Sequence, residues 1–321
     1  MQNMGELLTL SFYRNYAIHM RPYLLFVSGV AGVSGMALVT ENAELWRYLI
    51  AFISFFTGYG FGQALTDCFQ TDTDSISSPY RPLSRGLISK QNVLIVSLAG
   101  LIIGGILLLI LNWYNAILVI LSIIGLATYT YFKKNHWWLG PFYNAIIVVY
   151  LGWMGYLSVS EKPLVDLFNN RDLIFLSLLT FFSYTNFVLM GYLKDIEADR
   201  STGYKTFPVL FGWKAACFVG DLLAIFSIFL CWRLIDTQDW RSFPFFIAAS
   251  ILAIAGQYKA HRAKTPVPEN AAFAIECTVR CFLLWHLAVI VTHKPEWLIY
   301  SILFYGLFEL ALYLRPSKEQ I

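Results

Sequence analysis

Long apolar runs alternate with short polar stretches along almost the whole chain. Each run is close to the roughly 20 residues that an α-helix needs to cross the hydrocarbon core of a bilayer, which is about 30 Å thick. The eighth run is short and the ninth contains Glu276 and Arg280, so nine full spans are the alternative count. The pattern predicts ten membrane-spanning helices, at Tyr23–Thr40, Leu45–Leu65, Val93–Leu111, Ala116–Phe132, Gly140–Ser158, Leu173–Tyr192, Ala215–Trp232, Phe243–Tyr258, Ala271–Thr292 and Trp297–Leu314.

The composition indicates the same class of protein. Hydrophobic residues make up 58% of the 321 residues and charged residues only 13%, whereas soluble domains carry about 25% charged residues. The expected fold class is therefore an all-α polytopic membrane protein, surrounded by membrane lipid. The net charge of +3 comes without a basic patch, so no nucleic-acid partner is expected.

The first 22 residues differ from the rest of the chain. Met1–Met20 has no basic start followed by an apolar block, so no cleavable signal is expected there. The stretch ELLTLSFYRNYAIHM is interpreted as a short amphipathic segment at the membrane surface. The chain is therefore expected to form one transmembrane domain, residues 1–321, with residues 1–22 as an N-terminal interfacial segment.

A few polar and reactive residues inside the apolar runs are interpreted as structural. The five cysteines lie mostly within these runs without zinc-type spacing and are predicted to be packing residues. Glu276 and Arg280 are four positions apart, and Glu309 lies in the last span. They are predicted to pair with opposite charge inside the bundle.

The basic residues indicate an orientation in the membrane. When the N-terminus and every second loop are placed on one side, that side holds 16 of the 23 lysines and arginines and the other side holds six. The remaining one, Arg280, lies within a predicted span. The positive-inside rule therefore predicts that the N-terminus and the loops after the second and sixth spans face the cytoplasm.

Two polar clusters interrupt the apolar pattern at equivalent places. TDCFQTDTDSISSPYRPLSRG begins at Thr66 after the second span, and YLKDIEADRSTGYKTFPV begins at Tyr192 after the sixth. Each has acidic residues at a helix end, then a loop with basic residues, a glycine and a proline. The pattern indicates a weak parallel internal repeat, which would bring the two clusters face to face across a helical bundle.

The spacing of the acidic residues predicts metal ligands. If the second helix continues beyond its apolar run, Asp67, Gln70 and Asp74 share one face, and Asp195 and Asp199 share a face in the second cluster. Two oxygen-rich faces at one depth suit Mg²⁺, which takes one or two carboxylates and leaves positions for substrate phosphates. Two alternatives stay open: solvated charges at helix ends, and an ion-coupled transporter, whose ionisable residues would lie nearer the middle of the spans.

Basic residues gather at the same end of the predicted bundle. Carboxylates alone indicate a metal, whereas carboxylates together with Arg and Lys indicate a metal and a phosphorylated substrate. Taken singly, each basic residue is also explained as a topology anchor. These residues are Arg21, Arg81, Arg85, Lys133, Lys134 and Lys194.

The motifs resemble those of the UbiA superfamily of intramembrane prenyltransferases, and the resemblance covers nearly the whole chain. RPYLLFVSGVAG, from Arg21, resembles the opening of the family's first span, and the cluster at Thr66 resembles its first aspartate-rich motif. The tail of that cluster, PYRPLSRG, is especially similar to the chlorophyll-synthase and homogentisate branches. Tyr129 and Lys133 match a Tyr-x-x-x-Lys at the end of the fourth span, and KDIEADRSTGYKTFPVLFG closely resembles the second motif.

The resemblance implies a bundle of nine helices with a large cavity open to the lipid. That is one helix fewer than the apolar runs predict, and the surplus is expected near the C-terminus. One departure concerns the first motif: where the family has Asn and the middle Asp, this chain has Thr66 and Gln70. Gln70 offers a carbonyl oxygen but no negative charge. The change implies a weaker or differently arranged metal site, or an altered reaction.

The resemblance also implies roles for the clustered residues. Asp67 and Asp74 on one side, and Asp195 and Asp199 on the other, would be the catalytic and metal-binding carboxylates, and Mg²⁺ would bind the diphosphate of a polyprenyl donor with them. The allylic C–O bond would break towards a carbocation, and a lipophilic acceptor, most simply an aromatic ring, would attack it. The diphosphate itself would contact Arg81, Lys133, Tyr129, Lys194, Arg21 and Gln70.

Two alternatives to a transferase stay open at this point. A terpene cyclase on the same fold would capture the carbocation with the donor's own double bonds, and a membrane protein that kept the fold without catalysis would not bind a prenyl diphosphate with Mg²⁺. In a transferase or a cyclase, the ring faces of Phe69, Tyr131 and Tyr192 are candidates for shielding the carbocation. A quinone or tocopherol precursor, a chlorin-like ring and a polar lipid headgroup are all open as acceptors.

Overall fold

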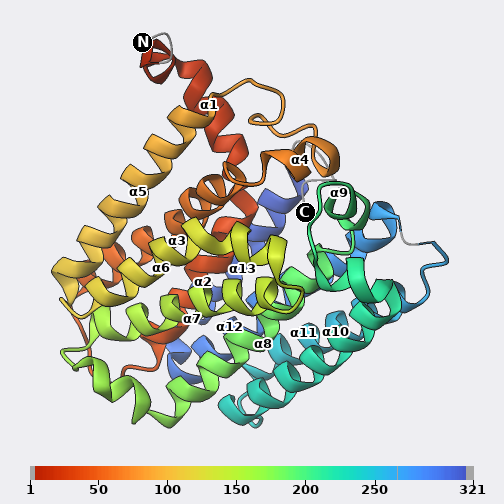
Figure 1. Ribbon diagram of the computed structural model, residues 1–321. Helices are drawn as coiled ribbons and strands as arrows, with labels where there is room; N and C mark the ends of the chain where they lie inside the picture. The colour runs from red at the N-terminus through yellow and green to blue at the C-terminus, as the bar shows by residue number, and fades with distance from the viewer. Residues whose placement is uncertain (1–3, 266, 316–321) are drawn as a thin grey trace.

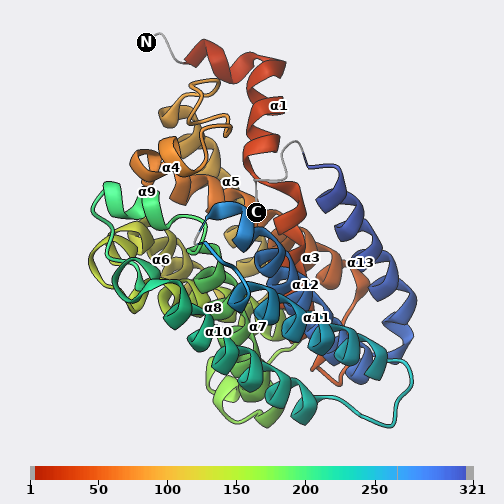
Figure 2. The same ribbon diagram turned by 90° about the vertical axis from the view of Figure 1, so that its right-hand side faces the viewer.

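The computed structural model describes residues 4–265 and 267–315, and these ranges contain thirteen α-helices and no strand. The helices form one bundle, shown from two sides in Figures 1 and 2. They are α1 (Leu10–His19), α2 (Leu25–Ala37), α3 (Leu45–Asp67), α4 (Thr71–Ser77), α5 (Lys90–Leu111), α6 (Asn115–Asn135), α7 (Leu139–Val159), α8 (Arg171–Gly191), α9 (Ile196–Ser201), α10 (Phe207–Leu234), α11 (Phe243–His261), α12 (Pro268–His293) and α13 (Leu298–Tyr313).

Each of the ten predicted apolar runs is a helix. Nine of the helices in the described ranges are long and apolar enough to cross a membrane, and α2 with its 3₁₀ start is a shorter apolar helix. The expectation that the surplus helix lies near the C-terminus is wrong, because α11, α12, and α13 together with the 3₁₀ turn before it (Pro295–Trp297) all reach spanning length. The short helix is α2, which is 13 residues long and buried along almost its whole length. A helix enclosed by other helices does not have to match the thickness of the bilayer.

Small residues let α2 pack closely against α7. A Cβ atom built on Gly35 would lie 1.9 Å from the carbonyl oxygen of Gly152, and one built on Gly155 would lie 2.0 Å from that of Gly32. Both distances are far below van der Waals contact, and the neighbour is backbone, which has little room to move. The two helices therefore meet through glycines, as closely packed membrane helices often do.

Replacement of Gly35 by alanine is expected to lower the stability of the bundle by about 1–3 kcal/mol, the usual cost of overpacking a dense interior. The measurement is thermal unfolding of the purified protein in detergent. Gly306→Ala on α13 is the matched control, because no described atom lies within 4 Å of a Cβ at that position. An equal melting temperature for wild type and Gly35→Ala would contradict this packing of α2 on α7.

The two halves of the bundle repeat one arrangement, as the sequence pattern predicts. Helix α3 packs against α5 in the first half, and α8 packs against α10 in the second, with α2 against α7 between the halves. The short helices α4 and α9, which carry the two polar clusters, contact each other. Both views show them side by side at one end of the bundle (Figures 1 and 2). Which side of the membrane this end faces stays a prediction from the basic residues.

The N-terminal segment is helical and docks on α5. Phe12 and Tyr16 of α1 are buried in a small apolar cluster with residues of α3 and α5. The hydroxyl groups of Tyr16 and Ser97 lie 2.8 Å apart, and Asn92 donates a 2.6 Å hydrogen bond to Glu6. Figure 2 shows α1 projecting from the body of the bundle. Its position at a membrane surface stays a prediction.

The charged residues inside the last two helices form the ion pairs that the sequence predicts. Arg280 on α12 contacts Glu309 on α13 at 2.8 Å and Glu276 at 3.1 Å, and Arg315 contacts Glu276 at 2.7 Å. All five cysteines are free and buried, which confirms the interpretation of them as packing residues.

Candidate active site

A cavity of about 220 Å³ ends between the two polar clusters. Its walls come from α2, α3, α5, α6, α7 and α8, with one residue each from α4 and α12, and the larger part of the wall is apolar. Among the ten residues that the sequence assigns to the site, Asp199 does not line this cavity. The other nine do, and they are Arg21, Asp67, Gln70, Asp74, Arg81, Tyr129, Lys133, Lys194 and Asp195.

The first cluster does not continue α3, so the prediction of one helix through Asp74 is wrong. Helix α3 ends at Asp67, and Gln70 has a non-helical backbone with φ −117° and ψ 19°. A new helix, α4, begins at Thr71, and the Asp72 side chain accepts a 2.9 Å hydrogen bond from the Thr73 amide. Short polar residues of this kind favour the start of a helix. Asp67, Gln70 and Asp74 reach the same cavity from two helices and the link between them.

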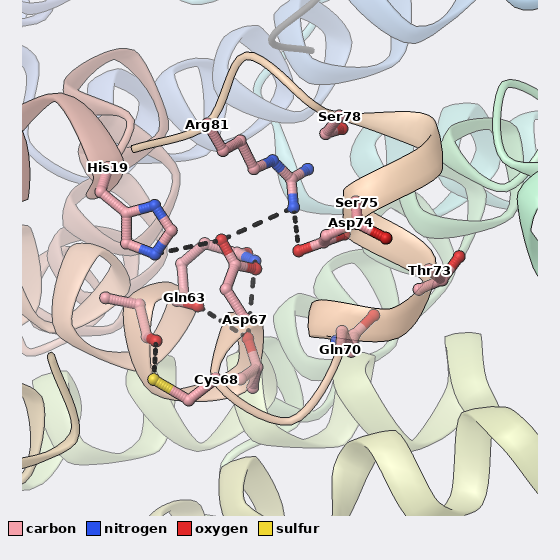
Figure 3. A network of polar contacts seen from close by, with 12 residues as sticks. His19, Gln63, Asp67, Cys68, Gln70, Thr73, Asp74, Ser75, Ser78 and Arg81 are labelled. Carbon is pink, nitrogen blue, oxygen red and sulfur yellow. Dashed lines mark hydrogen bonds and ion pairs between the residues drawn. The ribbon is translucent and has the colours of Figure 1, made fainter. Parts of the chain in front are cut away.

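Asp67 is held by several donors. Arg21 donates a 2.6 Å hydrogen bond to Oδ2, and Gln63 donates a 2.7 Å hydrogen bond to Oδ1. Nε2 of His19 and a guanidinium nitrogen of Arg81 each lie 3.6 Å from Oδ2 (Figure 3). The backbone of Arg21 has φ 54°, in the left-handed region that non-glycine residues seldom adopt. Its pairing with a buried carboxylate is what compensates for this strain.

Asp74 pairs with Arg81, which reaches between the carboxylates of Asp67 and Asp74 (Figure 3). Burial raises the pKa of Asp74 to about 6, although the Arg81 charge acts in the opposite direction. The charge of Asp195 in the second cluster also acts on Arg81 at longer range. The Arg81 charge is therefore stabilised by carboxylates of both clusters.

The two aspartates of the second cluster are one helical turn apart, as predicted, because the Asp199 amide donates a 2.7 Å hydrogen bond to the Asp195 carbonyl oxygen, but only Asp195 lines the cavity. Asp195 precedes the short helix α9 and lines the cavity, and its Oδ1 atom is buried without a hydrogen-bond partner among the described residues. Asp199 is fully buried and accepts 3.2 Å hydrogen bonds from Thr73 and Thr206. Because Thr73 lies on α4, Asp199 joins the two clusters instead of facing the cavity.

Two lysines and two tyrosines complete the polar end of the cavity. Nζ of Lys133 lies 3.5 Å from Asp199 and donates a 3.1 Å hydrogen bond to Gln70. The hydroxyl groups of Tyr129 and Tyr192 lie 2.7 Å apart, and Nζ of Lys133 stands 4.9 Å from the centre of the Tyr192 ring. Burial lowers the pKa of Lys194, which lines the cavity, to about 8. Its charge is therefore sensitive to what binds next to it.

Some residues of the site escape sequence reasoning. Gln63 precedes Asp67 by four positions, a helical spacing that could have indicated the contact. His19, Thr73 and Thr206 carry no comparable signal, because each meets its carboxylate through the tertiary structure. Burial lowers the pKa of His19 to about 4, so the ring beside Asp67 is neutral at ordinary pH.

One of the three aromatic candidates for cation shielding lies at the cavity, and the other two lie on the surface. Of the three aromatic residues that the sequence nominates, Tyr192 lines the cavity. Phe69 and Tyr131 point outwards, with 42% and 64% of their surfaces exposed, and neither is among the residues that line the cavity in the described part of the chain. The prediction of a shielding role is therefore wrong for Phe69 and Tyr131.

The fold and the site together define a multi-pass membrane protein with a cavity that ends in a cluster of carboxylates and cations. Residues 25–287 match the model of the UbiA prenyltransferase family, and the chain belongs to this family. The family resemblance that the motifs carry is thereby confirmed.

Relatives of known name share moderate sequence identity. The digeranylgeranylglyceryl phosphate synthase of Thermococcus kodakarensis is 28% identical over 209 residues, which cover 65% of this chain and 73% of that protein. The protein of the same name from Methanobrevibacter smithii is 27% identical over 214 residues, covering 64% of this chain and 72% of its own.

Solved structures share the fold. A UbiA homologue from Archaeoglobus fulgidus, determined with DMAPP and Mg²⁺, has a TM-score of 0.64 and 18% identity, covering 94% of this chain and 99% of its own. A UbiA homologue from Aeropyrum pernix K1 has a TM-score of 0.67 and 18% identity, covering 82% and 95%. Family membership and these relatives support prenyl transfer as the class of reaction.

The donor set at the cavity fits Mg²⁺. The described residues contain no preassembled group of three or more His, Cys, Asp and Glu side chains around a metal position. Mg²⁺ does not need one, because it commonly binds one or two carboxylates together with water and substrate phosphates. Asp195 offers a buried carboxylate oxygen that has no partner in the described structure, and Asp74 lines the same cavity. Asp67 is less available because both of its carboxylate oxygens accept hydrogen bonds, Oδ2 from Arg21 and Oδ1 from Gln63, whereas Arg81 pairs with Oδ2 of Asp74.

Proposed function

We propose that this protein transfers a prenyl group from a prenyl diphosphate to a lipophilic acceptor, with Mg²⁺ bound at the end of the cavity. The observation that carries the proposal is the composition of that end. Three carboxylates and four cationic side chains line one cavity whose remaining wall is mostly apolar. Such a set binds a metal and a diphosphate together, while the apolar wall accommodates a hydrocarbon tail.

The roles of the residues follow from their positions. Asp74 and Asp195 would hold Mg²⁺, which when bound lowers the charge of the diphosphate and makes it a better leaving group. Arg81, Lys133 and Lys194 would take the remaining phosphate charge by charge-assisted hydrogen bonds. Tyr129, whose hydroxyl lies 2.7 Å from that of Tyr192, would donate to the same group.

The reaction would take place in a setting that water does not easily enter. As the allylic C–O bond breaks, the electron pair leaves with the diphosphate, and the acceptor forms the new bond to the prenyl carbon and loses a proton. A mostly apolar cavity protects the cationic prenyl group from attack by water. It also buries the prenyl tail, which gains about 0.8 kcal/mol for each CH₂ removed from water.

For the acceptor we propose a hydroxyl-bearing lipid that carries a glyceryl phosphate. The support is the name shared by the relatives, digeranylgeranylglyceryl phosphate synthase, which denotes a product with prenyl groups on a glyceryl phosphate. The comparisons do not support the aromatic acceptor that the motifs first favour. An aromatic acceptor is therefore the alternative against which the glyceryl phosphate lipid is tested.

The test is prenyl transfer by the purified protein in lipid discs, with radiolabelled geranylgeranyl diphosphate, Mg²⁺ and a panel of acceptors. We expect diphosphate release that depends on geranylgeranylglyceryl phosphate and stops when Mg²⁺ is chelated. Release that requires an aromatic acceptor would contradict the proposed acceptor and keep the transferase. A hydrocarbon or terpene alcohol formed without any acceptor would indicate a cyclase. Absence of binding of the diphosphate with Mg²⁺ would indicate a non-catalytic protein.

Replacement of Gln70 by glutamate is expected to reduce the Mg²⁺ concentration for half-maximal activity about tenfold, which corresponds to about 1.4 kcal/mol. Gln70 lines the cavity and accepts a hydrogen bond from Lys133, so glutamate preserves the shape and the contact while adding a negative charge. Mg²⁺ titrations of prenyl transfer measure the effect. The control is Gln238→Glu, at an exposed position between α10 and α11. Equal titration curves for wild type and Gln70→Glu would mean that position 70 does not affect the metal.

A further inference from the structure

A second cavity, of about 680 Å³, lies at the opposite end of the bundle from the aspartate clusters. It is lined by the beginning of α3, including Tyr48, whereas α3 reaches the first cluster at Asp67. Nineteen residues of helix separate these two positions, which corresponds to about 28 Å along the helix axis. The other walls are the second half of α2, the end of α12, and α13.

This cavity is separate from the candidate active site. Among the described residues, none lines both cavities. Helix α2 presents Ser28 to the active-site cavity and Val30 and Val33 to the second one. Part of the second cavity also lies beyond residue 287, where the match to the family model ends. That part includes Lys294 and all the wall residues of α13.

Lys294 is the unusual residue of this second cavity. It lines the cavity with only 8% of its surface exposed. Its ammonium group makes no hydrogen bond and no ion pair within 4 Å with any residue that the structure describes, although its charge acts on Glu41 at longer range. The side chain lies against an apolar wall, and a cation there without a hydrogen-bonding partner is costly. The end of α12 favours a positive charge, but it does not supply the hydrogen bonds that the ammonium lacks.

The remaining lining resembles a site for lipid. The volume falls in the range of about 300–1,000 Å³ that is typical of small-molecule sites. The deeper wall is apolar, with residues such as Phe52 and Phe304, and Tyr48, Trp297 and Tyr300 lie where the helices begin. Tyr and Trp collect at the level of lipid headgroups. The exposed Glu296 also lines the cavity and disfavours a headgroup with several negative charges.

We propose that this cavity binds one membrane lipid whose headgroup carries a phosphate. The phosphate pairs with Lys294, and a hydrocarbon chain fills the apolar part of the cavity between α2, α3, α12 and α13. The lipid comes from the leaflet opposite the aspartate clusters and takes no part in the prenyl transfer proposed above. Its effect is to supply hydrogen-bond acceptors to the Lys294 ammonium and to connect α13 to the bundle.

Native mass spectrometry of the full chain in a neutral detergent tests this proposal. The purified protein is titrated with phosphatidylglycerol, or with an uncharged glycosyl diacylglycerol of the same chains. We expect wild type to retain one phosphatidylglycerol and to retain the uncharged lipid at least tenfold less well, because hydrogen bonds to charged groups are the strong ones. Lys294→Met should reduce retention of phosphatidylglycerol at least tenfold, and Lys294→Arg should restore it.

Two further variants make the experiment decisive. Ser301→Phe places a large ring in the cavity and should abolish retention without changing any charge, since Ser301 lines the cavity and is buried. Lys162→Met is the control, because Lys162 is exposed and contacts Glu41 at 3.9 Å; it should bind lipid as wild type does.

Two results would overturn the proposal. The first is equal retention of phosphatidylglycerol by wild type and Lys294→Met; if Lys294→Met also melts at a lower temperature in lipid-free detergent, Lys294 only stabilises the end of α12. The second is equal retention of the charged and uncharged lipids by wild type. None of these readouts depends on prenyl transfer, so the proposed function is tested separately.

Discussion

Replacement of Asp195 by asparagine is expected to lower prenyl transfer on the order of 10²–10³-fold, the size of effect seen when one preorganised electrostatic group is removed from an active site. Asn preserves the shape of the side chain but removes its negative charge. Asp195 is the carboxylate whose buried Oδ1 atom has no partner in the described structure, and it lines the cavity. Its Oδ1 atom is therefore available for Mg²⁺, whereas both carboxylate oxygens of Asp199 accept hydrogen bonds within the fold.

The stability of the same variant separates a catalytic role from a structural one. Because Oδ1 of Asp195 has no hydrogen bond to lose, the melting temperature of Asp195→Asn without ligand should equal or exceed that of wild type. Asp72→Asn is the matched control: Asp72 belongs to the first cluster but contacts Lys134 at 3.0 Å on the surface, so activity should change little. Wild-type activity of Asp195→Asn would exclude Asp195 as a metal ligand.

Replacement of Asp199 by asparagine is expected to destabilise the protein by about 3–5 kcal/mol, the cost of removing one partner from a buried ion pair. Asp199 is fully buried, contacts Lys133 at 3.5 Å and accepts hydrogen bonds from Thr73 and Thr206. Its loss leaves the Lys133 charge without a buried counter-charge and weakens the connection of α4 to α9. Activity should fall as well, because Lys133 lines the cavity.

Thermal unfolding and prenyl transfer, measured on both aspartate variants, test this distinction. We expect Asp195→Asn to lose activity with unchanged stability, and Asp199→Asn to lose both. Glu197→Gln is the control on α9, since Glu197 is exposed and pairs with Arg200 at 2.8 Å. If Asp199→Asn melted at the wild-type temperature and lost only activity, the two aspartates would act alike at the metal, contrary to their placement here.

The helices and the location of the site could be predicted because both depend on local sequence. An apolar run near 20 residues has few alternatives to a helix in a bilayer, since every backbone group must be satisfied within its own segment. The ten predicted runs are all helices in the structure. The acidic and basic residues stand at the ends of these runs, and a helix carries its terminal residues to one end of the bundle. Nine of the ten predicted site residues consequently line one cavity.

The roles of the two aspartates in the second cluster could not be read in the same way. Asp195 and Asp199 lie four positions apart, which would place them on one face of a regular helix. The spacing does place them one helical turn apart, since the Asp199 amide donates to the Asp195 carbonyl oxygen, but Asp195 lines the cavity whereas Asp199 accepts from Thr73 and Thr206. This difference in role is decided by contacts with other segments, here with Thr73 on α4, 126 residues away from Asp199 in sequence.

By itself, then, the sequence determined a helical membrane protein with two polar clusters, because hydrophobic run length and residue type act locally. The tertiary structure decided which carboxylates are available to a ligand and which hold the fold together. It alone shows that Arg21 and Gln63 donate hydrogen bonds to the Asp67 carboxylate, and that an oxygen of Asp195 has no partner among the described residues. It also shows that Lys294 is buried beside a second cavity. Electrostatic interactions in a low-dielectric interior depend on distances of a few ångströms between segments far apart in the chain, and no local pattern encodes those distances.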